Sequence, residues 1–392
     1  MTTTTKMIAQ VRQTDDDQRA RSALEADGNG QDVSWLGLRE RRGGAFSTVG
    51  LGKTAAARVD PDKTLDQGTI LLEFVAIPGA VDQVLLRYQS PEPLGLMFEI
   101  RLDLQGNLII THSEIGTRRS YRIDAGFVTR SNCVSLRFTW DADQGIGGLS
   151  MEIAETGALY FETLELPEPL VLRDAVRMFA CTQFMQLANG VRFVAIADET
   201  LPHGPLPTLG LDTWINTDRG RRSVSDLKPG DVVKDVNGRA AQVRWVGLAE
   251  VPARGRFAPR QICAPFHGAK TDLICSHDQL IRLAGSEVEY LFATDFVAAR
   301  VGDLSHGVLS VPPSRVPLAT YAQFVMDRPC VIDVSGVLIQ GLDIQELQDR
   351  PDLRRQSVLA NLPEVMIPTV SPARLDVLMP FETVAWSQMQ AA

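Results

Sequence analysis

Cysteine is scarce in this chain of 392 residues, which contains only five: Cys133, Cys181, Cys263, Cys275 and Cys330. The number is odd and no two cysteines stand at C-x-x-C spacing, so the sequence indicates neither a disulfide framework nor a zinc site. Cys133 and Cys275 lie in apolar alternating segments, where a cysteine usually packs as a small hydrophobic side chain. We therefore expect reduced thiols and synthesis in the cytoplasm.

Basic clusters and long apolar runs are missing as well. The formal net charge is −9, and the densest basic stretch holds only Arg219, Arg221 and Arg222, too few for the concentrated Lys/Arg face that binds nucleic acid. No run approaches the ~18 apolar residues of a membrane-spanning helix. The segment Met1–Lys6 lacks the apolar core of a secretory signal. These absences predict no nucleic-acid binding, no membrane span and no export by the Sec route.

The sequence also lacks the common catalytic motifs. It contains no Gly-rich phosphate loop, no Gly-x-Ser-x-Gly and no His-Glu-x-x-His, which argues against nucleotide binding, serine hydrolysis and metalloprotease chemistry. No pair of carboxylates can be singled out as glycosidase-like. Asp141 and Asp143 stand at a predicted hairpin, where acidic residues more often form a turn than the converging oxygens of a calcium site. We expect no metal and no cofactor.

What the sequence does contain, from about Leu65 to Thr200, is alternation of apolar and polar residues. The period is two in several segments, among them 70–75, 98–105 and 134–140. This alternation is typical of half-buried antiparallel strands, and no helical stretch of useful length interrupts it. We predict a β-sandwich or jelly roll.

Five side chains of this region are candidates for site residues. Trp140 shares a face with apolar neighbours and is expected in the core, and His112 is expected there with a hydrogen bond. Tyr88, Tyr121 and Tyr160 are expected to be partly exposed at strand edges. None of them is predicted to bind a ligand.

Three segments of this region, Val134–Asp143, Gly148–Ile153 and Val191–Glu199, resemble strands of a concanavalin-type or laminin-G-like jelly roll. The resemblance lies in the strand pattern. It implies a lectin-like sandwich, a fold that often binds glycans. Fold alone does not establish that activity, and the pattern identifies no ligand-binding residues.

A second resemblance covers nearly half of the chain. Thr213–Gly220, Val224–Val233 and Val243–Gly247 resemble the opening of the bacterial Hint domain, the autocatalytic module of hedgehog and intein proteins. In that family a Cys-Phe-x-Pro-Gly-Thr run opens the domain, and its Cys attacks the preceding peptide carbonyl. Alignment on Thr213 places Thr208 at the position of this Cys.

Two further catalytic positions of the family differ here. In the family's Ser-Pro-x-His run the His activates the scissile amide, but the residue three positions after Ser276 is Gln279, whose amide does not titrate near neutral pH. In the Tyr-x-x-Phe-x-x-Asp-Arg-His run, Pro329 stands at the His position and has no proton to give. His277 would share a strand face with Gln279 and could serve as a residual histidine. Asp327 and Arg328 are expected to pair.

The resemblance thus implies an all-β Hint domain that has lost its chemistry. Thr208 is a secondary alcohol with a pKa far above neutral, a weak nucleophile without an adjacent base. The alternative is an autoprocessing protein in which Thr208 attacks the carbonyl of Pro207.

We predict four parts, with the bounds 1–53 for an N-terminal arm, 54–201 for the lectin-like sandwich, 202–207 for a stiff Pro-rich linker and 208–392 for the Hint-like domain with a short C-terminal helical tail. The arm is polar except for Trp35, Leu36 and Leu38. These side chains either cover a corner of the sandwich or dock on a partner. Because they are costly to leave in water, we expect the arm to tether the protein to something larger.

The predicted function is non-enzymatic recognition of an envelope polysaccharide or other glycan. The setting we expect is a bacterial surface structure or a phage-like particle whose spike or fibre attaches to a cell. The Hint domain would be a structural module, the arm would contact assembly proteins, and the protein would be oligomeric and act at a particle or cell surface. Two alternatives stay open: autoprocessing before Thr208, and an assembly protein with no glycan ligand.

Overall fold

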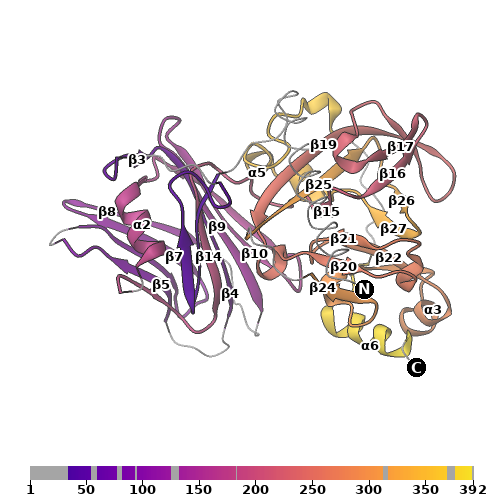
Figure 1. The fold of residues 1–392 in the computed structure, drawn as a ribbon, viewed down its shortest axis with the longest axis horizontal. Coiled ribbons are helices and arrows are strands. Elements are labelled where there is room, and N and C mark those ends of the chain that lie inside the picture. The colour runs from indigo at the N-terminus through magenta and orange to yellow at the C-terminus, as the bar shows by residue number, and fades with distance from the viewer. Residues whose placement is uncertain are drawn as a thin grey trace, which may run out of the picture.

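The structure is a computed structural model that describes residues 34–53, 60–76, 82–92, 95–124, 132–181, 183–311, 317–368 and 376–390. It consists of two β-rich lobes that lie side by side (Figure 1). Both lobes are built from antiparallel sheets, which confirms the prediction of a mainly β protein. No helix among the described residues is long and apolar enough to cross a membrane.

The N-terminal lobe is a sandwich of two sheets, one with seven strands and one with five. The seven-stranded sheet has the order β11 (Leu159–Glu165), β10 (Ile146–Ile153), β9 (Cys133–Asp141), β4 (Gln67–Val75), β14 (Val191–Ala197), β1 (Trp35–Glu40) and β2 (Gly43–Phe46). The five-stranded sheet has the order β13 (Met185–Leu187), β5 (Gln83–Gln89), β6 (Met97–Leu102), β7 (Leu108–Glu114) and β8 (Thr117–Ile123). Alternate side chains of each strand fill the core between the sheets.

One end of this sandwich is closed by a helix that the alternation pattern did not predict. The helix α2 (Leu172–Ala180) buries Leu172, Ala175, Met178 and Phe179 in the sandwich core. It follows a short two-stranded sheet of β12 (Leu170–Val171) and β3 (Thr64–Leu65). The expectation that no helix of useful length interrupts the strands was therefore wrong. Nine residues with one apolar face are enough to form a helix when that face packs against an existing core.

Most of the candidate site residues of the sandwich lie in its core. Trp140 is fully buried, as predicted, and His112 is in the core, but His112 Nδ1 has no hydrogen-bond partner among the described residues. Tyr88 and Tyr121 are buried, contrary to expectation, and only Tyr160 is partly exposed. Their hydroxyls explain the burial, because Tyr88 donates to a carboxylate and Tyr121 accepts a backbone N–H.

The C-terminal lobe contains a nine-stranded and a four-stranded sheet. The nine-stranded sheet has the order β17 (Gly220–Ser223), β16 (Trp214–Thr217), β18 (Val232–Lys234), β19 (Ala240–Pro252), β25 (Leu318–Met326), β15 (Leu209–Gly210), β21 (Leu273–Cys275), β20 (Arg260–Ile262) and β24 (Val308–Ser310). The four-stranded sheet has the order β23 (Phe296–Arg300), β22 (Leu280–Ala284), β27 (Val337–Gln340) and β26 (Val331–Val334). The longest pairing, between β19 and β25, runs through the middle of the lobe.

This lobe also contains short helices. They are α3 (Ser286–Phe292), α4 (Gln345–Asp349), α5 (Pro351–Arg354) and the C-terminal α6 (Pro380–Gln390). Five single 3-10 turns complete the described elements: Val224–Asp226, Gly255–Phe257, Phe266–Gly268, Val301–Asp303 and Glu364–Met366. The C-terminal helix agrees with the predicted helical tail.

The two lobes share a buried junction. Along β4, Ile70 and Leu72 face the sandwich core, whereas Leu71 between them faces a second apolar cluster that also contains Val251, Phe257 and Tyr321 of the C-terminal lobe. Strand β9 is buried along its whole length, including the polar residues on its outer face. The strands of this sheet were expected to be half-buried. Strand β9 and most of β4 are instead buried on both faces, because the C-terminal lobe covers the face that a free sandwich would expose to water.

The predicted arm needs correction where the structure describes it. Trp35, Leu36 and Leu38 belong to β1, which pairs with β14 inside the seven-stranded sheet, and they are 0%, 2% and 5% exposed. Trp35 also donates its Nε1–H to the carbonyl of Glu250 in the other lobe, at 2.8 Å. These side chains are part of the fold and are not free to dock on a partner. Residues 1–33 of the predicted arm lie outside the described residues.

Candidate functional site

The position of the family nucleophile, Thr208, lies at the start of the C-terminal lobe. Strand β15 follows it directly and is held between β21 and β25, with Leu209 opposite Cys275 on one side and Ala322 on the other. The carbonyl of Thr208 accepts the backbone N–H of Ser276 at 2.7 Å. These contacts place Thr208 beside the turn that carries Gln279 and beside Gln323 of β25.

Thr208, Gln279 and Gln323 form a closed hydrogen-bonded group, the neutral triad. Thr208 Oγ1 donates to Gln279 Oε1 at 2.7 Å, and Gln323 Nε2 donates to Thr208 Oγ1 at 2.9 Å and to Gln279 Oε1 at 3.2 Å. The remaining amide atoms bond to the backbone, Gln279 Nε2 to the Leu280 carbonyl and Gln323 Oε1 to the Phe324 N–H. Each side chain is thus satisfied by uncharged partners.

This arrangement cannot activate a nucleophile. The hydroxyl proton of Thr208 points to an amide oxygen, which has no useful basicity near neutral pH, so nothing removes the proton as attack begins. The neighbouring thiol is no substitute, because burial raises the pKa of Cys275 to about 12 and keeps it protonated. The structure therefore brings two of the three degenerate positions together and joins them through groups that do not titrate.

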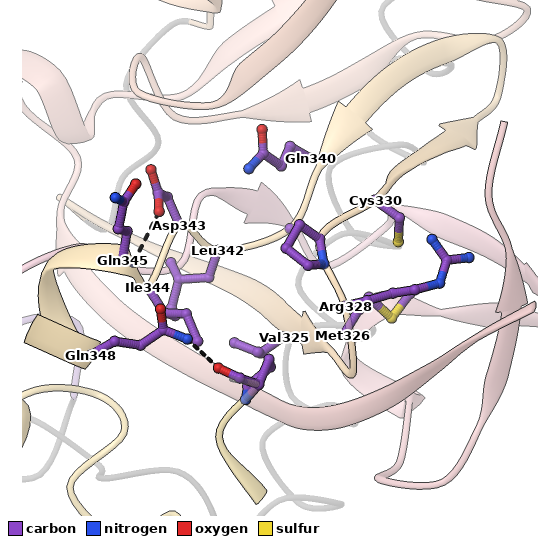
Figure 2. Close-up of a pocket in the computed structure, with 13 residues that line it drawn as sticks. Val325, Met326, Arg328, Cys330, Gln340, Leu342, Asp343, Ile344, Gln345 and Gln348 are labelled. Carbon is purple, nitrogen blue, oxygen red and sulfur yellow. Dashed lines mark hydrogen bonds between the residues drawn. The ribbon is translucent and has the colours of Figure 1, made fainter. Parts of the chain in front are cut away.

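Pro329, the third degenerate position, lies apart from the neutral triad. It lines a separate small pocket with Cys330, Gln345 and Gln348 (Figure 2), and the segment 340–343 lines both this pocket and the cleft that holds Thr208. The expected pairing of Asp327 with Arg328 is not formed. Arg328 Nη2 instead lies 2.9 Å from Asp235 Oδ2, in the turn between β18 and β19. Asp327 accepts the backbone N–H of Gln242, because the β19–β25 pairing brings these two residues together.

The residual histidine candidate, His277, does not join the neutral triad either. Its Nδ1 lies 3.2 Å from Asp278 Oδ1 and its Nε2 lies 3.6 Å from Asp303 Oδ1. The imidazole is thus held between two carboxylates, and no hydrogen bond connects it to Thr208 among the described residues. Its position matches a structural role rather than that of a general base.

A charged group that the sequence did not point to lies next to the neutral triad. We call it the junction cluster, and its centre is Arg256, whose Nη2 lies 2.9 Å from Asp278 Oδ1 and 3.0 Å from Glu152 Oε1 of the sandwich. The backbone N–H of Arg256 also donates to Glu73 Oε2 at 2.9 Å. Arg137 completes the cluster with Nη2 at 3.6 Å from Glu152 Oε2. The contacts of Arg256 with Glu152 and Glu73 cross between the lobes, and each joins residues more than a hundred positions apart.

The pKa shifts in this cluster show how tightly its charges are coupled. Burial works against the charge of Arg256, but Asp278 and Glu152 more than offset it and hold the pKa of the guanidinium above its ordinary value. Burial likewise opposes the charge of Asp278, and the charge of Arg256 still keeps the pKa of that carboxyl below its ordinary value. Arg137, which has less compensation, has its pKa lowered to about 10 by burial.

The predicted linker is also part of the packed structure rather than a free spacer. His203 is 1% exposed, and its Nε2 and Nδ1 lie 2.9 Å and 2.7 Å from the hydroxyls of Thr139 and Ser150 in the sandwich. Burial, assisted by the nearby charge of Arg137, lowers the pKa of His203 well below its ordinary value. The residues just before Thr208 are therefore fixed to the outer face of the seven-stranded sheet.

The neutral triad and the junction cluster line one cleft between the lobes, with a volume of about 160 Å³. Its sandwich wall includes Arg137 and Glu152, and its C-terminal wall includes Arg300, Gln340 and Asp343. Because side chains of both lobes form it, the cleft exists only when the two lobes are docked.

Comparison with known protein families agrees with this geometry. Residues 207–343 match the family described as Hint domain, and the match begins one residue before Thr208. The C-terminal lobe contains a Hint domain. The prediction made from Thr213–Gly220 and the following motifs is thereby confirmed. Comparison with curated protein sequences finds no match to this chain.

Solved structures give only remote likenesses. The carbohydrate-binding module CBM40 of a Ruminococcus gnavus sialidase, bound to α2,3-sialyllactose, is 14% identical, with coverage of 34% of this chain and 77% of that chain and a TM-score of 0.26. The gp41-1 intein is 13% identical over 34% of this chain and 98% of its own, with a TM-score of 0.21. Tailspike protein 2 of an Escherichia coli O157:H7 bacteriophage is 13% identical over 33% and 17%, with a TM-score of 0.22. TM-scores this low support no inference about the function of this chain.

Proposed function

We propose that this protein is a non-enzymatic recognition protein that binds a glycan of a bacterial envelope. In this proposal the Hint domain does not cut the chain and serves as a structural module that is docked to the sandwich. The protein would work at the surface of a cell or of a phage-like particle and would help a spike or fibre attach to its target.

The observation that carries the non-enzymatic part is the neutral triad. A Hint domain that processes itself needs a nucleophile that can lose its proton and a group that can protonate the leaving amine. Thr208, Gln279 and Gln323 supply neither, since all three side chains are neutral and already satisfied. Autoprocessing therefore remains the less favoured function.

The size of the purified full-length chain tests this part. We expect one species of 43.0 kDa after prolonged incubation at neutral pH, with or without dithiothreitol. A fragment that begins at Thr208 and forms without added protease would contradict the proposal and favour the autoprocessing alternative.

The glycan part draws its support from the two-sheet sandwich of the N-terminal lobe and from the absence of the common catalytic motifs in the sequence. A single site is expected to bind a polysaccharide weakly, and several copies on one particle would raise the avidity. The full-length chain, immobilised on beads at high density, should retain bacterial capsular polysaccharide or lipopolysaccharide, whereas beads that carry serum albumin should not. If neither material is retained and a glycan array is also blank, the protein is better explained as an assembly protein without a glycan ligand.

The particle setting does not rely on Trp35, Leu36 and Leu38, because these side chains are buried in the fold. Copurification of the native protein with particles released from its host, followed by immunogold labelling, would test it. Protein found only in the soluble fraction would contradict a role on particles.

A further inference from the structure

The cleft between the lobes has the features of a binding site, although the Hint chemistry that such a position serves is absent. Its volume of about 160 Å³ could hold on the order of ten water molecules at 10–15 Å³ each. The cleft is bordered by apolar side chains such as Leu206 and Leu342 and by many polar groups. A concave surface with an apolar lining and a few convergent polar groups is the usual form of a small-molecule site.

The formal charges of the side chains that line the cleft sum to zero, and most of these side chains form ion pairs with one another. Arg137, Arg256, Glu152 and Asp278 neutralise one another in the junction cluster. The additional cation is Arg300, which has no hydrogen bond or ion pair within the described part of the chain, and the additional anion is the exposed Asp343. A strongly charged ligand would therefore meet no net countercharge.

The groups left to bind a ligand are planar and polar. Arg300 offers the forked donors of a guanidinium, and Gln340 offers an amide that can donate and accept. Asp343 accepts the backbone N–H of Gln345 at Oδ1, at 3.1 Å, and offers its remaining carboxylate acceptor sites. Groups of this shape can each bond to two adjacent hydroxyls at once. A neutral molecule with many hydroxyls is the ligand class that matches them.

We propose that the cleft between the lobes binds a neutral sugar unit, held by Arg300 and Asp343. This inference rests on the proposed glycan recognition and assigns it to a site that needs both lobes, instead of to the sandwich alone. The position in the fold that a processing Hint domain uses for bond cleavage would here be used for binding. The rigid neutral triad forms the floor of the site and does not act on the ligand.

The test compares two double variants of the full-length protein by ligand-observed saturation-transfer NMR. The probes are the methyl glycosides of glucose, galactose, mannose, N-acetylglucosamine and rhamnose, with glucuronic acid as a charged comparison. In the cleft variant Arg300→Ala and Asp343→Ala are combined. The control combines Asp349→Ala with Arg355→Ala, which removes one exposed residue of each charge outside the cleft. Thermal melting of each variant checks that the fold is intact.

We expect at least one methyl glycoside to show saturation transfer with the wild type and with the control. We expect the cleft variant to lose at least ten-fold in affinity for that glycoside, which removes the signal. An unchanged signal in the cleft variant, a response to glucuronic acid alone, or no response to any methyl glycoside would overturn the assignment. If polysaccharide retention persists in the cleft variant, glycan recognition stands and only this site is wrong. If the wild type retains no polysaccharide and binds no glycoside, both proposals fail.

Discussion

The neutral triad and the junction cluster lie in the same cleft, yet they are built from opposite chemistry. Thr208, Gln279 and Gln323 are uncharged and bond to one another, whereas Arg256 forms ion pairs with Asp278 of its own lobe and with Glu152 of the sandwich. A processing domain needs titratable groups at the first position. Here the titratable groups lie beside it, where Arg256 and Glu152 join the two lobes.

The largest effect should come from breaking the junction cluster. Arg256→Met removes the buried cation between Glu152 and Asp278, two partly buried carboxylates whose ion pairs with it join the lobes and fix the turn beside the neutral triad. We expect a loss of ~3–5 kcal/mol in the free energy of unfolding, the usual cost of removing one partner of a buried ion pair. Urea denaturation followed by tryptophan fluorescence measures it.

Arg254→Met is the matched control for that experiment, because Arg254 also joins the lobes but forms an ion pair with a half-exposed Glu40. An exposed pair contributes only about 0–1 kcal/mol. If the two variants lose the same free energy of unfolding, the junction cluster contributes no more to stability than an exposed ion pair does.

A smaller effect is expected from the neutral triad. Gln279→Leu removes the acceptor of Thr208 Oγ1 and leaves part of a buried hydrogen-bonded group unsatisfied. The expected cost is ~1–3 kcal/mol, measured by the same denaturation. Gln186→Leu, at an exposed position of β13, should change stability by no more than about 0.5 kcal/mol. A Gln279→Leu protein as stable as the wild type would show that the triad is not a structural element.

The smallest effect concerns pH. Because the folded-state pKa of His203 is depressed, its stabilising contribution is fully present above the unfolded pKa of about 6.5 and is lost as the pH falls below it. His112 and His267, whose pKa values burial also lowers, act in the same direction. His203→Gln keeps a donor and an acceptor for Thr139 and Ser150 but does not titrate.

We therefore expect the His203→Gln protein to lose less stability than the wild type between pH 6.5 and pH 5, by up to ~1.4 kcal/mol per pH unit. Melting temperatures over this range, compared with each protein's own value at pH 7.5, provide the measurement. Identical slopes for the two proteins would exclude His203 as the titrating group.

The sequence predicted the elements whose signals are local. Alternation predicted the sandwich, and the motifs after Thr213 predicted the Hint domain. The sequence could not show that a second domain covers the outer face of β9, since alternation looks the same whether water or protein lies on the polar side. For that reason Arg137 and His203 were not recognised as buried residues.

Long-range contacts explain the other misses. The polar sequence neighbours of Trp35 favour a docking role, but its contacts come from β14 and from the carbonyl of Glu250, far along the chain. Arg256 lies in a short irregular segment with no pattern of its own, and its sandwich partners are Glu152 and the carboxylate of Glu73. Gln323 stands two residues after Tyr321, inside the stretch that matches the family's Tyr-x-x-Phe-x-x-Asp-Arg-His run. A search of that strand for polar residues on the apolar face could have found it.

The central claim is that the neutral triad does not let the Thr208 hydroxyl attack the Pro207 carbonyl and form an ester between Pro207 and Thr208 Oγ1. Hydroxylamine tests it directly, because it would attack such an ester and release a fragment that ends in a Pro207 hydroxamate and another that begins with Thr208. The purified wild type should show only its intact mass after incubation with hydroxylamine at neutral pH. Detection of the Pro207 hydroxamate would show that Thr208 attacks the preceding carbonyl, and would contradict the account.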